Sequence, residues 1–211
     1  MIDWLLNEFP AWFTTGLYHI LDIEGYDHML FLWALSVRYN FKNWKPLLLL
    51  VTAFTIGHCI TLICSTFDIF RLPFNWIEIA IAFTVFISAG IPFFKVNGQG
   101  IKRLIQIQPI ITTSKTYYLS ALFFGFIHGM GFSNLLIELL GKQASITGPL
   151  LGFNVGIEVG QLLFVFSVLA ITTAISAIKP RHYPTFISLS LLLCVLISVQ
   201  MIADRISSLF V

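Results

Sequence analysis

Long apolar stretches separated by short polar connections run through most of this chain, and this pattern predicts a helical membrane protein. A helix needs ~20 predominantly apolar residues to cross the hydrocarbon of a bilayer. Stretches of about that length lie at Leu17–Val37, Pro46–Thr66, Pro73–Phe94, Thr116–Leu139, Pro149–Ile178 and Pro184–Asp204. The predicted fold class is therefore all-α, a polytopic membrane protein with six transmembrane helices in a single domain over residues 1–211. Its halves, 1–94 and 116–211, are joined by a cytoplasmic loop at 95–115.

The N-terminal region departs from this regular pattern in two ways. The segment from Trp4 to Thr15 is amphipathic and rich in Trp and Phe, which predicts a helix in the membrane interface. The ten residues from His19 to His28 contain five ionisable groups and Gly25. A regular lipid-facing helix would leave those groups unsatisfied, so we expect the first span to break near Gly25.

Composition and charge support a membrane protein and set its predicted orientation. The chain is 57% hydrophobic and only 10% charged, whereas soluble domains carry about 25% charged residues. The net charge of +2 is too small to indicate a nucleic-acid partner. Nine of the 12 Lys and Arg residues lie in the first, third and fifth connections. By the positive-inside rule these connections are cytoplasmic, so both termini face outward.

Ionisable side chains interrupt the apolar stretches, and such residues in a bilayer point to a functional site. At a rise of 1.5 Å per helical residue, His28, His58 and His128 fall ~12–18 Å below the outer surface. Glu158 falls in the same layer, and Glu78 lies shallower, at ~8 Å. The candidate metal ligands are His19, Asp27, His28, His58, Glu78, His128 and Glu158. The polar residues expected to support them are Thr61, Asn154 and Gln161.

The types of these side chains favour a divalent transition metal. Imidazole and carboxylate ligands suit zinc, nickel, cobalt or iron. Asp27 directly precedes His28, and a carboxylate commonly orients a metal-binding imidazole. A proton relay without metal and a structural hydrogen-bonded core are the alternatives, and for His19 and Glu78 a structural role competes closely with ligation. The cysteines lack C-x-x-C spacing and are interpreted as small buried hydrophobes; they are Cys59, Cys64 and Cys194.

The sequence also contains a weak internal repetition. The third stretch opens with Phe74-Asn-Trp-Ile-Glu78, and the fifth opens with Phe153-Asn-Val-Gly-Ile-Glu158. Each follows a stretch with a central histidine, so two equivalent hairpins would form a parallel repeat. Chance similarity is the alternative interpretation.

Four ordered motifs resemble those of the HupE/UreJ family. They are Gly16–Leu32 with Asp27-His28, Phe54–Leu62 with His58, Phe124–Phe132 with His128, and Phe153–Gln161 with Glu158. The resemblance implies that these five residues belong to the family's motif set, together with His19. It also implies a multi-pass protein of the bacterial inner membrane that transports nickel or cobalt for hydrogenase or urease systems. The first motif here lacks the usual proline after its first histidine, and Cys59 stands where serine is common.

We therefore expect a transporter of nickel or cobalt, or else of zinc or iron, rather than an enzyme. The cation would enter from the outer face and lose its water at the histidine layer. The alternatives are a metal-dependent intramembrane hydrolase, with Glu158 or Asp27 as its base, and a metal-binding accessory protein. No G-x-S-x-G or H-E-x-x-H motif favours an enzyme, and the sparse polar groups of the inner half favour a one-sided site. The expected partners are the lipid bilayer and the metal ion; a homo-oligomer and an accessory partner are both left open.

Overall fold

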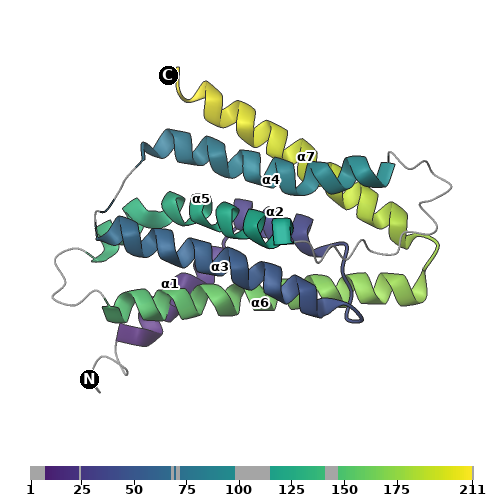
Figure 1. The fold of residues 1–211 in the computed structure, drawn as a ribbon, viewed down its shortest axis with the longest axis horizontal. Coiled ribbons are helices and arrows are strands. Elements are labelled where there is room, and N and C mark those ends of the chain that lie inside the picture. The colour runs from purple at the N-terminus through teal and green to yellow at the C-terminus, as the bar shows by residue number, and fades with distance from the viewer. Residues whose placement is uncertain are drawn as a thin grey trace.

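Helices make up all the regular secondary structure of the part of the chain that the structure describes. The computed structural model describes residues 8–23, 25–67, 69, 72–97, 115–140 and 147–210. Its helices are α1 (Phe9–Leu21), α2 (Tyr26–Ser36), α3 (Trp44–Thr66), α4 (Phe74–Asn97), α5 (Lys115–Leu140), α6 (Thr147–Ile178) and α7 (Tyr183–Ser207), shown in Figure 1. The predicted all-α class is confirmed. Most of the loop predicted at 95–115 lies outside the described residues.

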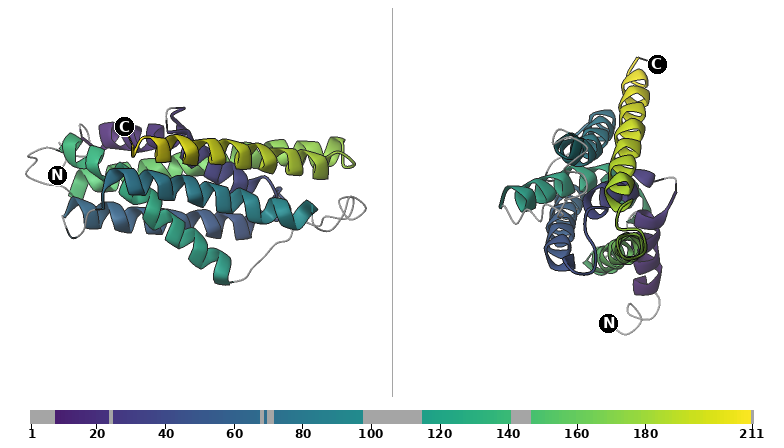
Figure 2. Two further views of the ribbon diagram at one scale, coloured as in Figure 1. Left: turned by 90° about the horizontal axis from the view of Figure 1, so that it is seen from above. Right: turned by 90° about the vertical axis from the view of Figure 1, so that its right-hand side faces the viewer.

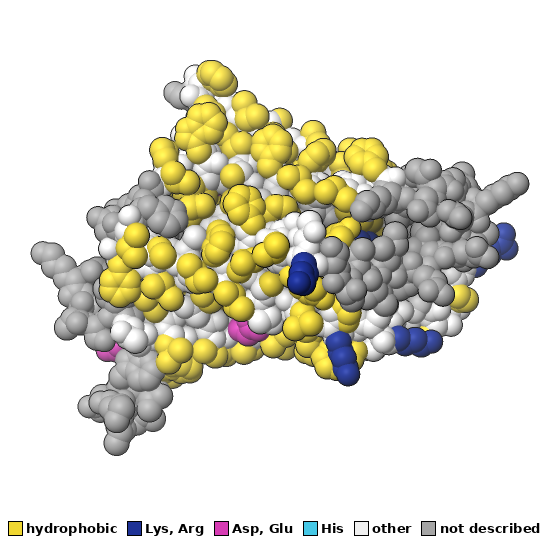
Figure 3. Space-filling model, in the orientation of Figure 1, with side chains coloured by type: hydrophobic (Ala, Val, Ile, Leu, Met, Phe, Trp, Pro, Cys, Tyr) yellow, Lys and Arg dark blue, Asp and Glu magenta, His cyan; other side chains and the backbone are white. Residues whose placement is uncertain are grey.

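The described surface is that of a helical membrane protein. Four helices are long and apolar enough to cross a membrane: α3, α4 over Phe74–Phe94, α6 and α7. Hydrophobic side chains cover most of the described face in Figure 3, and its Lys and Arg side chains lie toward the right-hand end. The count of six crossings and the outward termini stay predictions.

The long helices run back and forth along one axis of the molecule, with α5 inclined to the others (Figure 2). In Figure 1, α4 and α6 end, and α3 and α7 begin, toward the right-hand end, whereas both chain ends lie at the left. The basic connection between α6 and α7 is therefore at the opposite end from both termini.

The first predicted span is broken, as its polar residues led us to expect. α1 ends at Leu21 and α2 begins at Tyr26, with Asp22 in an extended conformation (ψ 132°) and Gly25 directly before α2. The break predicted near Gly25 is confirmed. The boundary predicted at Leu17 is wrong, because α1 begins at Phe9 and continues through it. Residues 9–15, which belong to the segment interpreted as an interfacial helix, form the first part of α1, and α1 packs along α6.

Glycines allow two pairs of helices to approach closely, α1 with α6 and α3 with α5. A Cβ on Gly16 or Gly156 would overlap a backbone carbonyl oxygen across the first pair, and one on Gly57 or Gly125 would do so across the second. Small residues at such crossings are the usual way in which membrane helices pack without a hydrophobic driving force. These crossings bring the middle of α1 and the middle of α3 toward a shared core.

Large aromatic side chains fill that core between the helix pairs. Phe31, Phe54 and Phe153 are at most 1% exposed. A second, smaller cluster lies mainly between α4 and α7, and it includes Ala89, Ile187 and Cys194. Cys194 is thus a buried small hydrophobe, as predicted, and all three cysteines are free thiols.

Candidate metal centre

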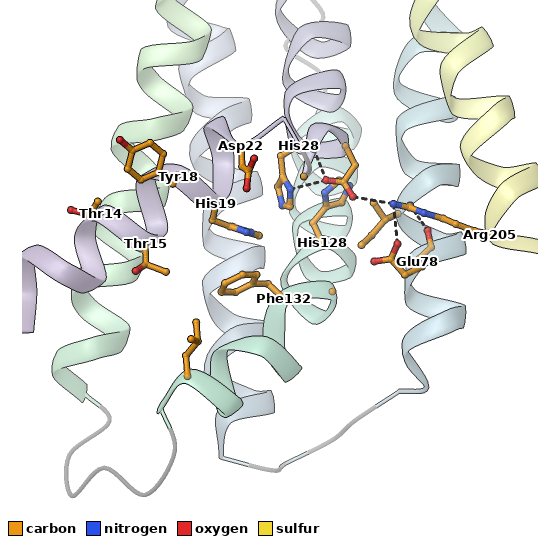
Figure 4. A pocket seen from close by; sticks show the side chains of 15 residues that line it. Thr14, Thr15, Tyr18, His19, Asp22, His28, Glu78, His128, Phe132 and Arg205 are labelled. Atoms are coloured by element: carbon orange, nitrogen blue, oxygen red, sulfur yellow. Dashed lines mark hydrogen bonds and ion pairs between the residues drawn. The ribbon is translucent and has the colours of Figure 1, made fainter. Parts of the chain in front are cut away.

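A cavity of about 580 Å³ opens near the end of the bundle where the chain termini lie. It is enclosed by α1, α2, α4, α5 and α7 (Figure 4). Most of its polar lining comes from predicted site residues and their neighbours, namely His19, Asp22, Asp27, His28, Glu78, His128 and Arg205. The cavity therefore gathers ionisable groups from five different helices into one place.

Three imidazoles converge beside this cavity, and two of them, His19 and His28, line it. One nitrogen from each of His19, His28 and His58 lies within 4.8 Å of the other two, and the ring centroids are 4.6–5.8 Å apart. They come from α1, α2 and α3. The break between α1 and α2 is what allows residues only nine positions apart to face each other, because a continuous helix would separate them by ~13 Å along its axis.

The nitrogens of this histidine triad have the properties of metal ligands. Nε2 of His19 and His28 and both ring nitrogens of His58 are buried and have no hydrogen-bond partner among the described residues. Buried polar atoms are normally paired, so such atoms need another explanation. An ion bonded to imidazole nitrogens at ~2.0–2.1 Å would hold them roughly 3–3.5 Å apart. Small side-chain rotations from the observed spacing would provide that geometry.

Asp27, one of the candidate ligands predicted from the sequence, forms hydrogen bonds with His28. Its Oδ1 accepts hydrogen bonds from the backbone N–H of His28 at 2.8 Å and from His28 Nδ1 at 3.0 Å. Because a carboxylate only accepts, Nδ1 carries the proton, and the lone pair of Nε2 is left free to point at the triad. Asp27 therefore acts on the site through His28.

Arg205 of α7 forms ion pairs with two carboxylates of the cavity. Its Nη2 lies 2.9 Å from Glu78 Oε2 and 3.3 Å from Asp27 Oδ2, and its Nη1 donates to the Glu78 carbonyl oxygen at 2.6 Å (Figure 4). Glu78 is thus held in an ion pair in the cavity wall, away from the triad. In the sequence, Arg205 stands out only as the single basic residue after the last stretch. Only the fold reveals that it reaches across to α2 and α4.

His128 adjoins the triad and is held by a residue that the sequence did not indicate. Its ring is fully buried, and its centroid lies 5.0 Å from that of His28. Nε2 forms a 2.7 Å hydrogen bond with the hydroxyl of Thr84 in α4, while Nδ1 has no partner among the described residues. His128 therefore borders the triad through His28, but the group whose ligand atoms lie within 4.8 Å of one another is His19, His28 and His58. A threonine in the middle of an apolar helix was the available signal for Thr84.

The polar stripe of α6 lies elsewhere. Gln161 accepts a 2.6 Å hydrogen bond from Thr55 of α3, and Glu158 is near enough to Cys59 of the same helix to interact with it electrostatically. None of the four residues predicted here lines the histidine cavity; they are Thr61, Asn154, Glu158 and Gln161. The hydroxyl of Thr61 donates to a carbonyl oxygen of its own helix at 3.0 Å. The structure thus brings the four histidines together but does not bring Glu158 to them.

Nearly the whole chain matches one protein family. The family model described as HupE / UreJ protein matches residues 4–205. No curated protein and no solved structure is similar enough to this chain to count as a match.

Proposed function

This chain belongs to the HupE/UreJ family, and from that premise we propose that it transports a divalent transition metal, nickel or cobalt, across the bacterial inner membrane. The observation that carries the proposal is the convergence of His19, His28 and His58, with their unpaired nitrogens, beside an open cavity.

The donor set supports nickel, cobalt or zinc over harder or softer ions. Three neutral imidazole nitrogens suit these metals, whereas magnesium and calcium prefer oxygen and copper(I) prefers sulfur. Asp27 and Glu78 carry two negative charges against one positive charge on Arg205. This excess of one negative charge beside the triad favours a cation.

The break between α1 and α2 supports transport over simple metal storage. In transporters, discontinuous helices place unsatisfied backbone and side-chain groups in a cavity where a solute can reach them. Here the break separates His19 from His28, and both line the cavity. The predicted topology opens this cavity to the outer face.

The hydrolase alternative has less support. It needs a general base beside a metal-bound water. Of the two expected bases, Asp27 is engaged by His28 and Arg205, and Glu158 is not part of the cavity wall. One observation favours a non-transporting accessory role. Phe31 and Phe54 are buried next to the histidines, so they fill space that a transported ion would need.

Metal binding and flux test the proposal directly. We would measure nickel, cobalt and zinc binding to the purified protein by calorimetry, and uptake into proteoliposomes with a metal-sensitive dye inside. His58→Ala should abolish stoichiometric binding and flux, whereas the matched control His182→Ala, at an exposed residue before α7, should leave both unchanged. Wild-type protein that binds metal without flux would exclude transport, and wild-type protein that binds none would exclude the metal site.

A further inference from the structure

Two helix pairs in this fold make the same glycine contacts, although they come from different parts of the chain. A Cβ on Gly16 of α1 would overlap the carbonyl oxygen of Phe153 in α6, and one on Gly125 of α5 would overlap the carbonyl oxygen of Phe54 in α3. In both cases the added Cβ would also approach the backbone nitrogen of the residue four positions further along. The distances are 3.1 Å to Ile157 N for Gly16 and 3.0 Å to His58 N for Gly125. The α1–α6 and α5–α3 crossings therefore have the same register.

The reciprocal contacts match as well. A Cβ on Gly156 of α6 would overlap the Phe13 carbonyl oxygen in α1, and one on Gly57 of α3 would overlap the Leu122 carbonyl oxygen in α5. At every one of these contacts the residue number in α5 exceeds that in α1 by 109, and the number in α6 exceeds that in α3 by 99. A single set of equivalences thus relates α1 to α5 and α3 to α6.

The sequence letters agree with these equivalences. α1 contains Gly16-Leu-Tyr-His19 where α5 contains Gly125-Phe-Ile-His128, and α3 contains Phe54-Thr-Ile-Gly57 where α6 contains Phe153-Asn-Val-Gly156. Two cavity histidines, one from each half, are therefore equivalent. The parallel repeat suggested by the sequence matched α6 with α4 instead, and that pairing is not the one with shared contacts.

The two halves are related by inversion. α3 and its equivalent α6 run in opposite directions (Figure 1), and Thr55 of α3 bonds Gln161 of α6. Cys59 and Glu158 are themselves equivalent, differing by 99, and a pair that maps onto itself is expected beside a twofold axis. The pair α1 and α3 and the pair α5 and α6 are thus related as in an inverted repeat, an arrangement that lets transporters open a central site to either side in turn.

A second cavity lies toward the opposite ends of α4 and α5 from the histidine cavity. It has a volume of about 90 Å³ and is lined by the later part of α4, at Ser88 and Pro92, and the early part of α5, at Ser120 and Phe124. The histidine cavity instead uses the early part of α4 and the later part of α5. The two cavities therefore approach the core from opposite ends of the bundle.

Phe31 lies between the two cavities. Phe31 lines the second cavity, one helical turn after His28, which lines the first. Its ring is 1% exposed, stacks on Phe54 with centroids 4.6 Å apart, and lies 5.3 Å from the ring of His128. A solute that leaves the histidines toward the second cavity has to displace this ring.

We propose that the second cavity is the far half of the cation pathway and that Phe31 is the barrier that closes it in this conformation. The identity of the cargo rests on the proposed function, but the existence of the passage does not. When each of the two inverted units adopts the conformation that the other has here, the second cavity opens and the first closes.

Cysteine labelling tests the passage without any metal. In a background with Cys59→Ser, Cys64→Ser and Cys194→Ala, reporters Thr15→Cys and Ser88→Cys probe the first and second cavities. We expect a charged, membrane-impermeant methanethiosulfonate to label them from opposite faces of proteoliposomes. Labelling of Ser88→Cys from the same face as Thr15→Cys, or from neither face, would overturn the proposal.

The barrier is tested by shortening Phe31. Phe31→Ala should let reagent added at the Thr15 face label Ser88→Cys about tenfold faster, the rate change that follows removal of ~1.4 kcal/mol of barrier. Phe164→Ala, at a partly buried phenylalanine outside both cavities, is the matched control. If Phe31→Ala fails to fold, Phe31→Leu replaces it, with an intermediate increase expected. Unchanged labelling in a folded variant refutes the barrier.

The same samples separate this proposal from the proposed function. A labelling pattern as expected, together with no metal flux in the wild type, supports the passage but rejects metal as its cargo. Normal metal flux with Ser88→Cys inaccessible from both faces rejects this passage and leaves metal transport standing.

Discussion

Replacement of Asp27 measures how much the orientation of His28 contributes to metal binding. Asp27 accepts the 3.0 Å bond from His28 Nδ1 and so directs Nε2 at the triad, without itself pointing there. Loss of such a supporting carboxylate typically lowers metal affinity by about 10–100-fold. We expect Asp27→Ala to approach the upper end, about 100-fold or ~2.8 kcal/mol. Asp27→Asn keeps an acceptor but loses the charge, which roughly halves the strength of the hydrogen bond, so about tenfold is expected.

The assay is calorimetric titration of the purified variants with nickel, cobalt and zinc, with thermal unfolding as the test of folding. The matched control is Glu8→Gln, which removes an exposed carboxylate at the start of α1. Its affinity should equal that of the wild type. Folded Asp27→Ala protein with affinity within about twofold of the wild type would refute the orienting role of Asp27.

Three further predictions follow from other contacts. Gly125→Ala should destabilise the protein by about 1–3 kcal/mol in chemical unfolding, because its Cβ has no room against α3; Gly90→Ala, whose Cβ would meet only a ring atom at 3.9 Å, should be tolerated. Thr84→Val should lower stability by about 0.5–1.5 kcal/mol through loss of its hydrogen bond to the imidazole of α5, and an unchanged unfolding curve would contradict that bond. Arg205→Met should lower the melting temperature because two carboxylates lose their counter-charge, and adding Glu78→Gln should recover part of the loss; additive effects of the two changes would contradict the ion pair.

The meeting of the histidines could be predicted from the sequence, but the direction of each polar side chain around its helix could not. His28, His58 and His128 were expected in one layer, and their rings lie together in the core. Glu158 was expected in the same layer, yet it lies near enough to Cys59 to interact with it electrostatically. Residue spacing gives the height of a side chain along a helix, whereas the neighbour that it faces depends on how the helices pack.

The sequence by itself determined the helical membrane class, the break before α2 and the residue types of the site. These are local features of the sequence: runs of apolar residues, a glycine among ionisable groups, and Asp27 next to His28. Each can be interpreted from the properties of a short segment alone. Only the tertiary structure decided which groups meet. Arg205 forms ion pairs with Glu78 and Asp27, which are more than 120 positions away in the sequence. Thr84 of α4 forms a hydrogen bond with His128 of α5. The glycine crossings of α1 with α6 and of α3 with α5 bring these side chains together. They depend on contacts between distant segments, which no local pattern specifies.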